Sequence, residues 1–471
     1  MMHALSVAFL FLAIFFCAAI SAEPTTIALP AKGPYFPCDD RIIEDRWQVE
    51  RFVVPLTRDP HNPLIVKDHP WEGTGPHAGG SVIYDPDDGL FKMWYSVWNE
   101  YAYYNRLRFS YNVCYAESKD GINWQKPETG CFTYKGDSRN NCIRLGRNKT
   151  QNIDVELNPH PASPREKFIA IHNDSGGVFV STSADGKCFD CGFEQPAVKY
   201  HSDTHNNFVY DEVRDRWLMY VRPKAYAGAR LKGVGRRRSA VKESHDLKQW
   251  TPEVTVLVPG EDDPDYFYGN TVFRCGDLFF GMLQHYETVH HRLYCELIWS
   301  ADGYYWQRLP TRAQKFALPD AAEGSWDWGM TFFFDKPVLK GKEMLFYYGG
   351  SNTAHNESGT YAIGLVKTPL NRLIGVRSKS GEQSRILTRP IRIDGDLWIN
   401  AKACGEIRVQ LTTIEDEPID GWQAEDCAPF SGDDLEYRVR WGDRGLDAMR
   451  GQTVRIRFCL EDAELYAFDI H

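Results

Sequence analysis

One turn sequence recurs along the chain and constrains its fold more than any other feature. Each copy has a serine, an aspartate two residues later, a short turn and then an aromatic residue. The copies are Ser118 to Trp124, Ser183 to Phe189, Ser244 to Trp250 and Ser300 to Trp306, with a degenerate fifth at Val366 to Leu373. The four aromatic residues lie 65, 61 and 56 positions apart. A steady period of this length indicates stacked repeats of one supersecondary unit.

The residues of the repeat are those of a tight turn. An aspartate side chain can bond the amides of its own turn, and glycine supplies a positive φ. The aromatic residue is then free to fill a neighbouring sheet. We therefore predict a structural role for the aspartates of the repeat, which are Asp120, Asp185, Asp246 and Asp302.

The spacing between the turns predicts the architecture of each unit. Between about residues 63 and 376 the chain is a succession of short β-rich runs, and helical periodicity is almost absent. The first unit has runs at 80–85, 91–95 and 112–116 before the turn at 118–124. Four strands in each of five units predict an all-β chain whose main domain, 63–376, is a five-bladed β-propeller.

The remaining segments differ from this repeat. Residues 1–22 are apolar and end in a small-residue pattern, which predicts a cleaved signal peptide and a secreted or periplasmic protein; a membrane anchor is the alternative reading. We expect residues 23–62 to form an N-terminal strap over the propeller. Residues 385–471 alternate apolar and polar positions, which predicts a small C-terminal β-sandwich.

Charge and cysteine content narrow the classes of partner. The net charge of −10 argues against a nucleic-acid partner. Twelve cysteines, of which eleven follow the signal peptide, fit an oxidising compartment with some disulfides. Cys188 and Cys191 form a CxxC pair, and no second pair stands at zinc spacing. We predict ordinary thiols or a disulfide there, and we predict no metal site from the sequence.

Candidate chemistry lies before the first strand of each unit, because the first strands of a propeller line its central channel. Carboxylates and aromatic residues recur at these positions. A pair of carboxylates can cleave a glycosidic bond, one as acid and the other as base or nucleophile. The candidate carbohydrate-binding residues are Trp71, His77, His205, Arg237, Tyr268, Asp265, Trp326 and Asp327.

The repeated turns, together with strands such as 91–95, resemble those of the five-bladed propeller glycoside hydrolases, the invertase and arabinanase superfamily of families 32 and 43. The resemblance covers about two-thirds of the chain, and its members carry three acids on the first three blades. It implies that Asp154 is the transition-state stabiliser, Asp203 the general acid and Glu72 the base or nucleophile. The familiar Asn-Asp-Pro-Asn-Gly and Glu-Cys motifs are absent. The resemblance requires no cofactor and allows a structural calcium ion.

Purely structural roles for the same residues remain alternatives. Glu72, Asp154 and Asp203 each fit a cap, turn or solvated role. Asp85, Asp211 and Asp335 follow the first strands, and we expect them to be ordinary turn residues. Arg237 belongs to a run of three arginines that is either a solvated charge run or, if one reaches the channel, a partner for a uronate or sulfate.

The leading hypothesis is a secreted glycoside hydrolase acting on a plant or algal poly- or oligosaccharide. A carbohydrate-binding propeller without catalysis and a glycan phosphorylase are the alternatives. The sugar, the linkage and the oligomeric state do not follow from the sequence.

Overall fold

The computed structural model describes residues 33–145, 151–174, 176–190, 195–203, 205–224, 237–263, 266–310, 322–355, 357–379 and 383–471. The predicted signal peptide and Asp265 lie outside these residues. The described chain is almost entirely β, which confirms the predicted class. Its helical segments are short and include α1 (Glu100–Tyr104), η1 (Pro70–Glu72), η2 (Pro164–Glu166) and η4 (Leu446–Met449). In the described ranges no helix is long and apolar enough to cross a membrane.

Three successive antiparallel sheets follow the first 70 residues. The first comprises β5 (Gly75–Asp85), β6 (Leu90–Trp98) and β7 (Tyr111–Ser118). The second comprises β8 (Gln151–Leu157), β9 (Phe168–Asp174) and β10 (Gly177–Ser183). The third comprises β11 (Asn207–Asp211), β12 (Arg216–Val221), β13 (Ser239–Ser244) and β14 (Val254–Leu257). Within each sheet consecutive strands pair, so each is a meander.

Two further meanders are joined into one sheet by a single parallel pair, Leu293 with Met330. The fourth comprises β15 (Tyr266–Cys275), β16 (Leu278–Glu287), β17 (Arg292–Ser300) and β18 (Trp306–Gln307). The fifth comprises β19 (Met330–Phe333), β20 (Val338–Lys340), β21 (Glu343–Ser351) and β22 (Tyr361–Pro369). Two short strands that precede the first meander also join this sheet. They are β3 (Thr57–Arg58) and β4 (Ile65–Val66), and each pairs with β22.

The meanders follow one another in a closed series. β5 contacts β8, β8 contacts β11, and β11 contacts β15. The fourth and fifth meanders meet through β17 and β19, and β19 contacts β5 of the first, so the series closes on itself. Apolar clusters fill the spaces between neighbouring meanders, such as the one that packs Val82 and Met93 against Leu345. Closure leaves few unpaired strand edges exposed.

The repeated turns connect each meander to its neighbour. In the three turns that contain glycine, the serine hydroxyl accepts from the glycine amide. In all four turns the aspartate accepts from two backbone amides that follow it. The glycine carbonyl then accepts a hydrogen bond from an aromatic side chain of the neighbouring meander. These bonds join Tyr347 to Gly121 (2.7 Å), Trp94 to Gly186 (2.6 Å) and Tyr220 to Gly303 (2.9 Å). The turn aspartates are structural, as predicted.

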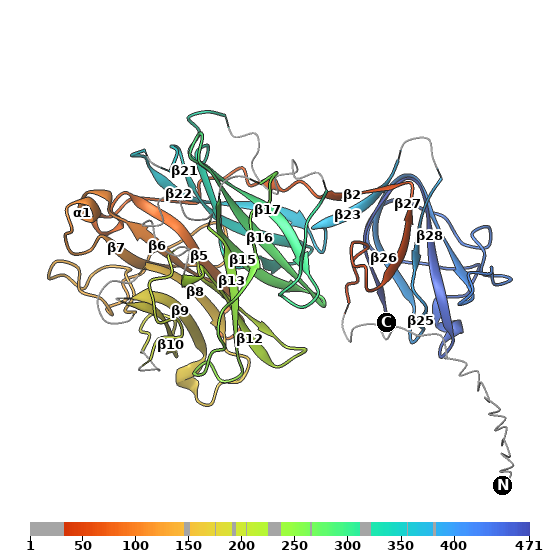
Figure 1. Cartoon of the computed structure of the whole chain (residues 1–471), viewed down its shortest axis with the longest axis horizontal. Helices are drawn as coiled ribbons and strands as arrows, with labels where there is room; N and C mark the ends of the chain where they lie inside the picture. The colour runs from red at the N-terminus through yellow and green to blue at the C-terminus, as the bar shows by residue number, and fades with distance from the viewer. Residues whose placement is uncertain are drawn as a thin grey trace, which may run out of the picture.

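The C-terminal strands form a second part of the molecule (Figure 1). They are β23 (Ile374–Ser378), β24 (Ser384–Thr388), β25 (Ile391–Arg392), β26 (Leu397–Thr412), β27 (Phe430–Arg438) and β28 (Thr453–Ile470). Within the segment predicted to alternate, residues 397–412 form one strand, β26, which is bent by irregularities after Asn400 and Ala403. A bulge lets a strand change direction without ending.

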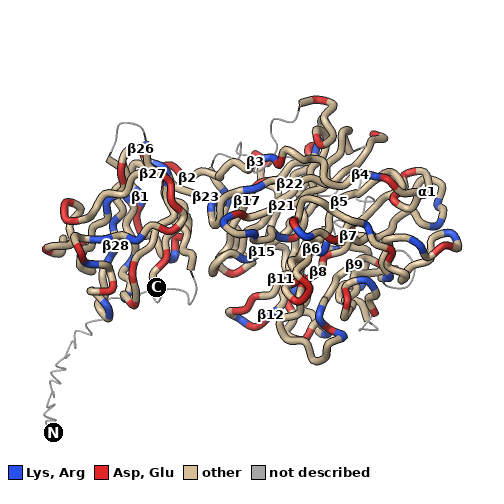
Figure 2. Tube along the Cα trace, turned by 180° about the vertical axis from the view of Figure 1, so that it is seen from behind, with Lys and Arg blue, Asp and Glu red and all other residues tan. Residues whose placement is uncertain are grey.

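Part of the segment predicted as a strap belongs to this second part. β1 (Ile43–Trp47) pairs with β24, and β2 (Val49–Val53) pairs with β23. β2 and β23 run side by side between the two parts of the molecule (Figure 1). Acidic and basic positions are interspersed over both parts (Figure 2).

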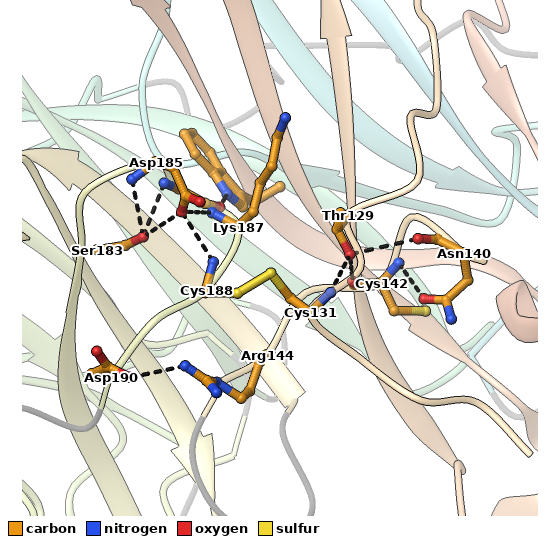
Figure 3. The surroundings of a disulfide bond; sticks show 12 residues. Thr129, Cys131, Asn140, Cys142, Arg144, Ser183, Asp185, Lys187, Cys188 and Asp190 are labelled. Atoms are coloured by element: carbon orange, nitrogen blue, oxygen red, sulfur yellow. Dashed lines mark hydrogen bonds and ion pairs between the residues drawn. A yellow bond between two sulfur atoms is a disulfide. The ribbon is translucent and has the colours of Figure 1, made fainter. Parts of the chain in front are cut away.

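A disulfide links the first two meanders. Cys131, from the segment after β7, is bonded to Cys188, which belongs to the repeated turn of the second meander (Figure 3). Cys191 lies outside the described residues. Because Cys188 is oxidised to a disulfide, it does not supply a thiolate for zinc.

Candidate functional site

Glu72 lies in the short helical turn η1, just before the first meander, and its carboxylate is enclosed by protein hydrogen-bond donors. Its side chain is fully buried. One oxygen accepts from the amides of Asp68 and His69, at 2.9 and 3.0 Å. The other accepts from the Tyr95 hydroxyl at 2.9 Å and the Lys126 ammonium at 2.7 Å. Four donors hold this carboxylate, which is the arrangement of a structural group.

Three more predicted residues lie in structural positions. The Trp71 indole donates a hydrogen bond of 2.6 Å to a buried amide side chain. Asp327 is 1% exposed and accepts from Arg58 at 2.7 Å and from the Tyr348 hydroxyl at 2.8 Å. Trp326 stacks on the same tyrosine ring. These contacts account for the polar atoms of Asp327 without a ligand.

The structure does bring His77, His205 and Tyr268 together. They come from the first, third and fourth meanders and surround Phe332 of β19. The ring centroids lie 5.9 Å, 5.6 Å and 5.9 Å from that of Phe332, respectively. We call these four residues the axial aromatic cluster. It lies at the ends where the first strands begin.

Hydrogen bonds and close packing fix this cluster. The Tyr268 hydroxyl is 2.8 Å from Nε2 of His355, and the Gln284 side-chain amide is 2.5 Å from Nδ1 of His205. Gly79 has a φ of +85°, and a Cβ there would lie 2.4 Å from Nε2 of His205. Because Gly79 has no side chain, the imidazole of His205 can pack against its backbone.

His77 favours the neutral form. Burial, with His355 and His205 nearby, lowers the pKa of His77 to about 3, and the charge of Asp203 opposes the shift. The imidazole of His77 is therefore uncharged at neutral pH and is suited to hydrogen bonding rather than to taking up a proton.

Asp203 joins the axial aromatic cluster through Arg222. Its Oδ2 lies 3.1 Å from Nη1 of Arg222, whose side chain is 1% exposed. Nε and Nη2 of Arg222 both donate to the backbone carbonyl of Tyr268, at 3.1 and 2.9 Å. The Asp203 side chain remains 36% exposed. Asp203 is thus the one of the three predicted acids that solvent reaches in the described structure.

Arg237 also reaches this region. Its guanidinium carbon lies 4.9 Å from the ring centroid of Tyr268 and 5.6 Å from that of Tyr266. Sequence reasoning included Arg237 among the binding candidates but missed Arg222, because a single arginine after a strand gives no signal of its direction.

Asp154 is buried in β8 and connects this strand to two other first strands, β5 and β11. Its Oδ2 accepts from the Asn207 side chain and the Phe208 amide of β11, both at 2.8 Å. Its Oδ1 accepts from the Ser81 hydroxyl of β5 at 3.3 Å. Asp154 is 3% exposed, and burial raises its pKa. This buried position suits a supporting carboxylate better than one that meets solvent.

Two further acids, Glu156 and Asp335, stand beside Asp154, with ligand atoms within 4.8 Å of one another. Burial raises the pKa of Glu156 to about 7, and burial together with Asp154 raises that of Asp335 well above its usual range. Lys336 forms an ion pair with Glu156. Carboxylates at this spacing fit a cation such as calcium, but the lysine already supplies positive charge.

Asp335 differs from the ordinary turn residue that we expected. Asp85 and Asp211 follow their strands and bond to buried cationic side chains, including Lys92 at 2.6 Å and Arg274 at 2.5 Å. Asp335 instead lies beside other acids, and its Oδ2 has no hydrogen-bond partner in the described structure. Asp335 follows a strand as they do, but the acids Asp154 and Glu156 lie beside it, whereas basic side chains lie beside Asp85 and Asp211.

An aromatic series connects the cluster to the surface. His77 lies 5.4 Å from Trp98, and Trp98 lies 5.9 Å from Tyr103 and 6.3 Å from Tyr104. The two tyrosines belong to α1, where Tyr104 is 69% exposed. Exposed aromatic faces of this kind can stack on the apolar faces of ligands.

No protein-family model and no curated protein matches the sequence. Similar solved structures include an N-acetylgalactosamine deacetylase from F. plautii in complex with blood group B trisaccharide (16% identity, TM-score 0.48, 67% of this chain and 96% of that one). An α-L-arabinofuranosidase from Podospora anserina in complex with cellotriose has 12% identity, TM-score 0.46 and coverage of 69% and 98%. A Bombyx mori GH32 β-fructofuranosidase has 10% identity, TM-score 0.39 and coverage of 88% and 94%.

GH62 and GH43 hydrolases are also among the similar structures. Several of these similar structures are therefore glycoside hydrolases, which is the class of protein that the sequence resembles. The TM-scores of these structures lie below 0.5, and therefore no activity is assigned to this chain from them.

Proposed function

We propose that the chain is a secreted glycoside hydrolase whose five meanders are the blades of a propeller, followed by a C-terminal β-sandwich. The single observation that carries the proposal is the position of Asp203. It is a partly exposed carboxylate, held by a buried arginine and close to His77, from which an aromatic series leads to the surface. Glycosidic bond cleavage requires a carboxylate as base or nucleophile and a proton for the leaving oxygen, and Asp203 supplies the first.

The roles differ from those that the resemblance implies. Asp203, ion-paired to Arg222, is suited to act as a carboxylate that activates water or attacks the sugar. His77 and His205 lie beside Tyr268, where they can hydrogen-bond sugar hydroxyls, and the leaving glycosidic oxygen takes its proton from solvent water, which reaches Asp203. Asp154 has a supporting role, because it accepts hydrogen bonds from Ser81 of β5 and from the Phe208 amide of β11 and so holds these strands together. Glu72 is not given a chemical role, because its oxygens already accept four hydrogen bonds.

The test is a panel of plant and algal polysaccharides, read by the release of reducing sugars. The wild type should release sugars from at least one of them, and Asp203→Asn should lose this activity by orders of magnitude. Asp190→Asn is the matched control, because Asp190 forms an exposed ion pair with Arg144. If Asp203 acts as base or nucleophile, added azide should restore part of the activity of Asp203→Asn. Equal activity in wild type and Asp203→Asn would reject the assignment.

A carbohydrate-binding propeller without catalysis is the second candidate. It is favoured by one observation: of the three predicted acids, only Asp203 meets solvent. Glycoside hydrolases ordinarily use two working carboxylates. Glycan binding without any release of sugar across the panel would support this candidate.

A further inference from the structure

Two arginines pack against one tyrosine at the axial aromatic cluster. The guanidinium carbon of Arg222 lies 4.5 Å from the ring centroid of Tyr268, and that of Arg237 lies 4.9 Å from it. Each distance is within the range for attraction between a cation and an aromatic face. Two positive charges are therefore gathered around one side chain.

The two arginines are satisfied to different extents. Arg222 uses Nε, Nη1 and Nη2, bonding to the Tyr268 carbonyl and to Asp203. Arg237 has a buried Nη1 that lacks a hydrogen-bond partner in the described part of the chain. An unsatisfied buried donor costs about 1–3 kcal/mol, more when it is charged. Arg237 is thus held in place by aromatic rings and not by an acceptor.

The charges do not balance locally. Asp203 is ion-paired to Arg222, and no ion pair is found for Arg237 in the described ranges. The two guanidiniums are close enough that Arg237 adds to the effect of burial in lowering the pKa of Arg222. A positive charge that has no ion-pair partner among the described residues, next to the proposed glycan site, favours an anionic group on that glycan. A guanidinium binds a carboxylate or a sulfate through two parallel hydrogen bonds.

We propose that the glycan substrate carries a carboxylate or sulfate group, and that Arg237 binds this group while Arg222 positions Tyr268 and Asp203. The inference rests on the proposed function, since it places the anion on the substrate of the same site. It does not depend on catalysis, because binding can be measured without turnover.

The test compares charged and neutral forms of the same backbone by affinity electrophoresis of the full chain in native gels. Polygalacturonate is compared with its fully methyl-esterified form, and a sulfated carrageenan with agarose. These two arms distinguish a carboxylate from a sulfate. The protein should be retarded by one charged polymer and not by its neutral partner. Arg237→Gln should weaken this binding about 10- to 100-fold, the loss expected for a hydrogen-bonded ion pair.

Arg144→Gln is the matched control, because it removes the same charge from an exposed ion pair (Figure 3). Its binding should equal that of the wild type, and Arg237→Lys should recover only part of it, because an ammonium lacks the fork geometry. Equal binding of charged and neutral polymers, no binding to either charged polymer, or an equal loss in Arg144→Gln and Arg237→Gln would each overturn the inference.

The outcomes separate this inference from the proposed function. Release of sugars from neutral glycans alone would leave the hydrolase intact and reject the anionic substrate. Binding of a charged polymer that depends on Arg237, with no release of sugars, would support the anionic ligand and reject the hydrolase.

Discussion

Asp203 and Arg222 form an ion pair whose two ends differ in environment. The carboxylate side chain is 36% exposed, whereas the guanidinium is 1% exposed. The arginine also bonds twice to the carbonyl of Tyr268. One buried cation therefore fixes both a solvent-accessible carboxylate and the strand that carries Tyr268.

Asp203→Asn should separate the chemical role from the structural one. Removing the carboxylate leaves a buried guanidinium without its ion-pair partner, but solvent reaches the site, so we expect a stability loss of about 1–2 kcal/mol. Catalytic activity should fall by orders of magnitude. Chemical unfolding and single-substrate kinetics on the same preparation measure both. A loss of activity no larger than the loss of folded protein would show that Asp203 is only structural.

Glu72→Gln should affect stability and not chemistry. The change removes a charge that balances the nearly buried Lys126 and places an amide opposite hydrogen-bond donors. We expect a loss of about 3 kcal/mol in unfolding free energy, with activity per folded molecule maintained. Glu50→Gln, in an exposed pair with Arg377, is the control and should change stability by less than about 0.5 kcal/mol. A large loss of turnover in stable Glu72→Gln would restore Glu72 as the base.

The repeat made the arrangement of strands predictable, because its turns mark the same point of each meander. It also made it predictable that His77, His205 and Tyr268 would lie near one another, because all three stand close to the beginning of first strands. It did not locate Glu72 correctly. Position before a strand does not determine the direction of a side chain, and the cap that Glu72 forms depends on Lys126, 54 residues later.

The same limit applies to Asp335 and to the long C-terminal strands. A turn residue after a strand looks alike whether a lysine or another carboxylate faces it. Likewise, the bulges in β26 interrupt the alternation of apolar and polar residues without ending the strand. Both outcomes depend on partners that are distant in the sequence.

The group of three neighbouring acids, Asp154, Glu156 and Asp335, should make the stability of the protein depend on pH. Burial raises the pKa of Asp154 and Asp335, and that of Glu156 to about 7, so the folded state binds more protons than the unfolded state between about pH 4 and 7. Their contribution to the unfolding free energy therefore falls as pH rises through this window. Asp335→Asn should reduce this fall and stabilise the protein at pH 8 relative to wild type. Identical pH profiles of the two proteins would contradict this.

The disulfide should contribute substantially to stability. It closes a loop of 57 residues between Cys131 and Cys188, for which the loss of unfolded-chain entropy is worth about 4 kcal/mol. We expect a lower midpoint of thermal unfolding for Cys131→Ser, and no further decrease when reductant is added to that variant. An unchanged midpoint would indicate that the bond does not constrain the unfolded chain.

The glycine of the repeated turn should resist substitution for two reasons that can be separated. Gly186 has a φ of +76°, and a Cβ there would lie 2.6 Å from the Trp94 ring of the neighbouring meander. Gly130 has a similar φ of +67°, but a Cβ there would meet nothing within 4 Å. Gly130→Ala should therefore show the backbone cost alone, about 1 kcal/mol. Gly186→Ala should add an overpacking cost of about 1–3 kcal/mol. Equal losses in denaturant unfolding would mean that Trp94 moves aside, and that the turn does not fix the spacing of neighbouring meanders.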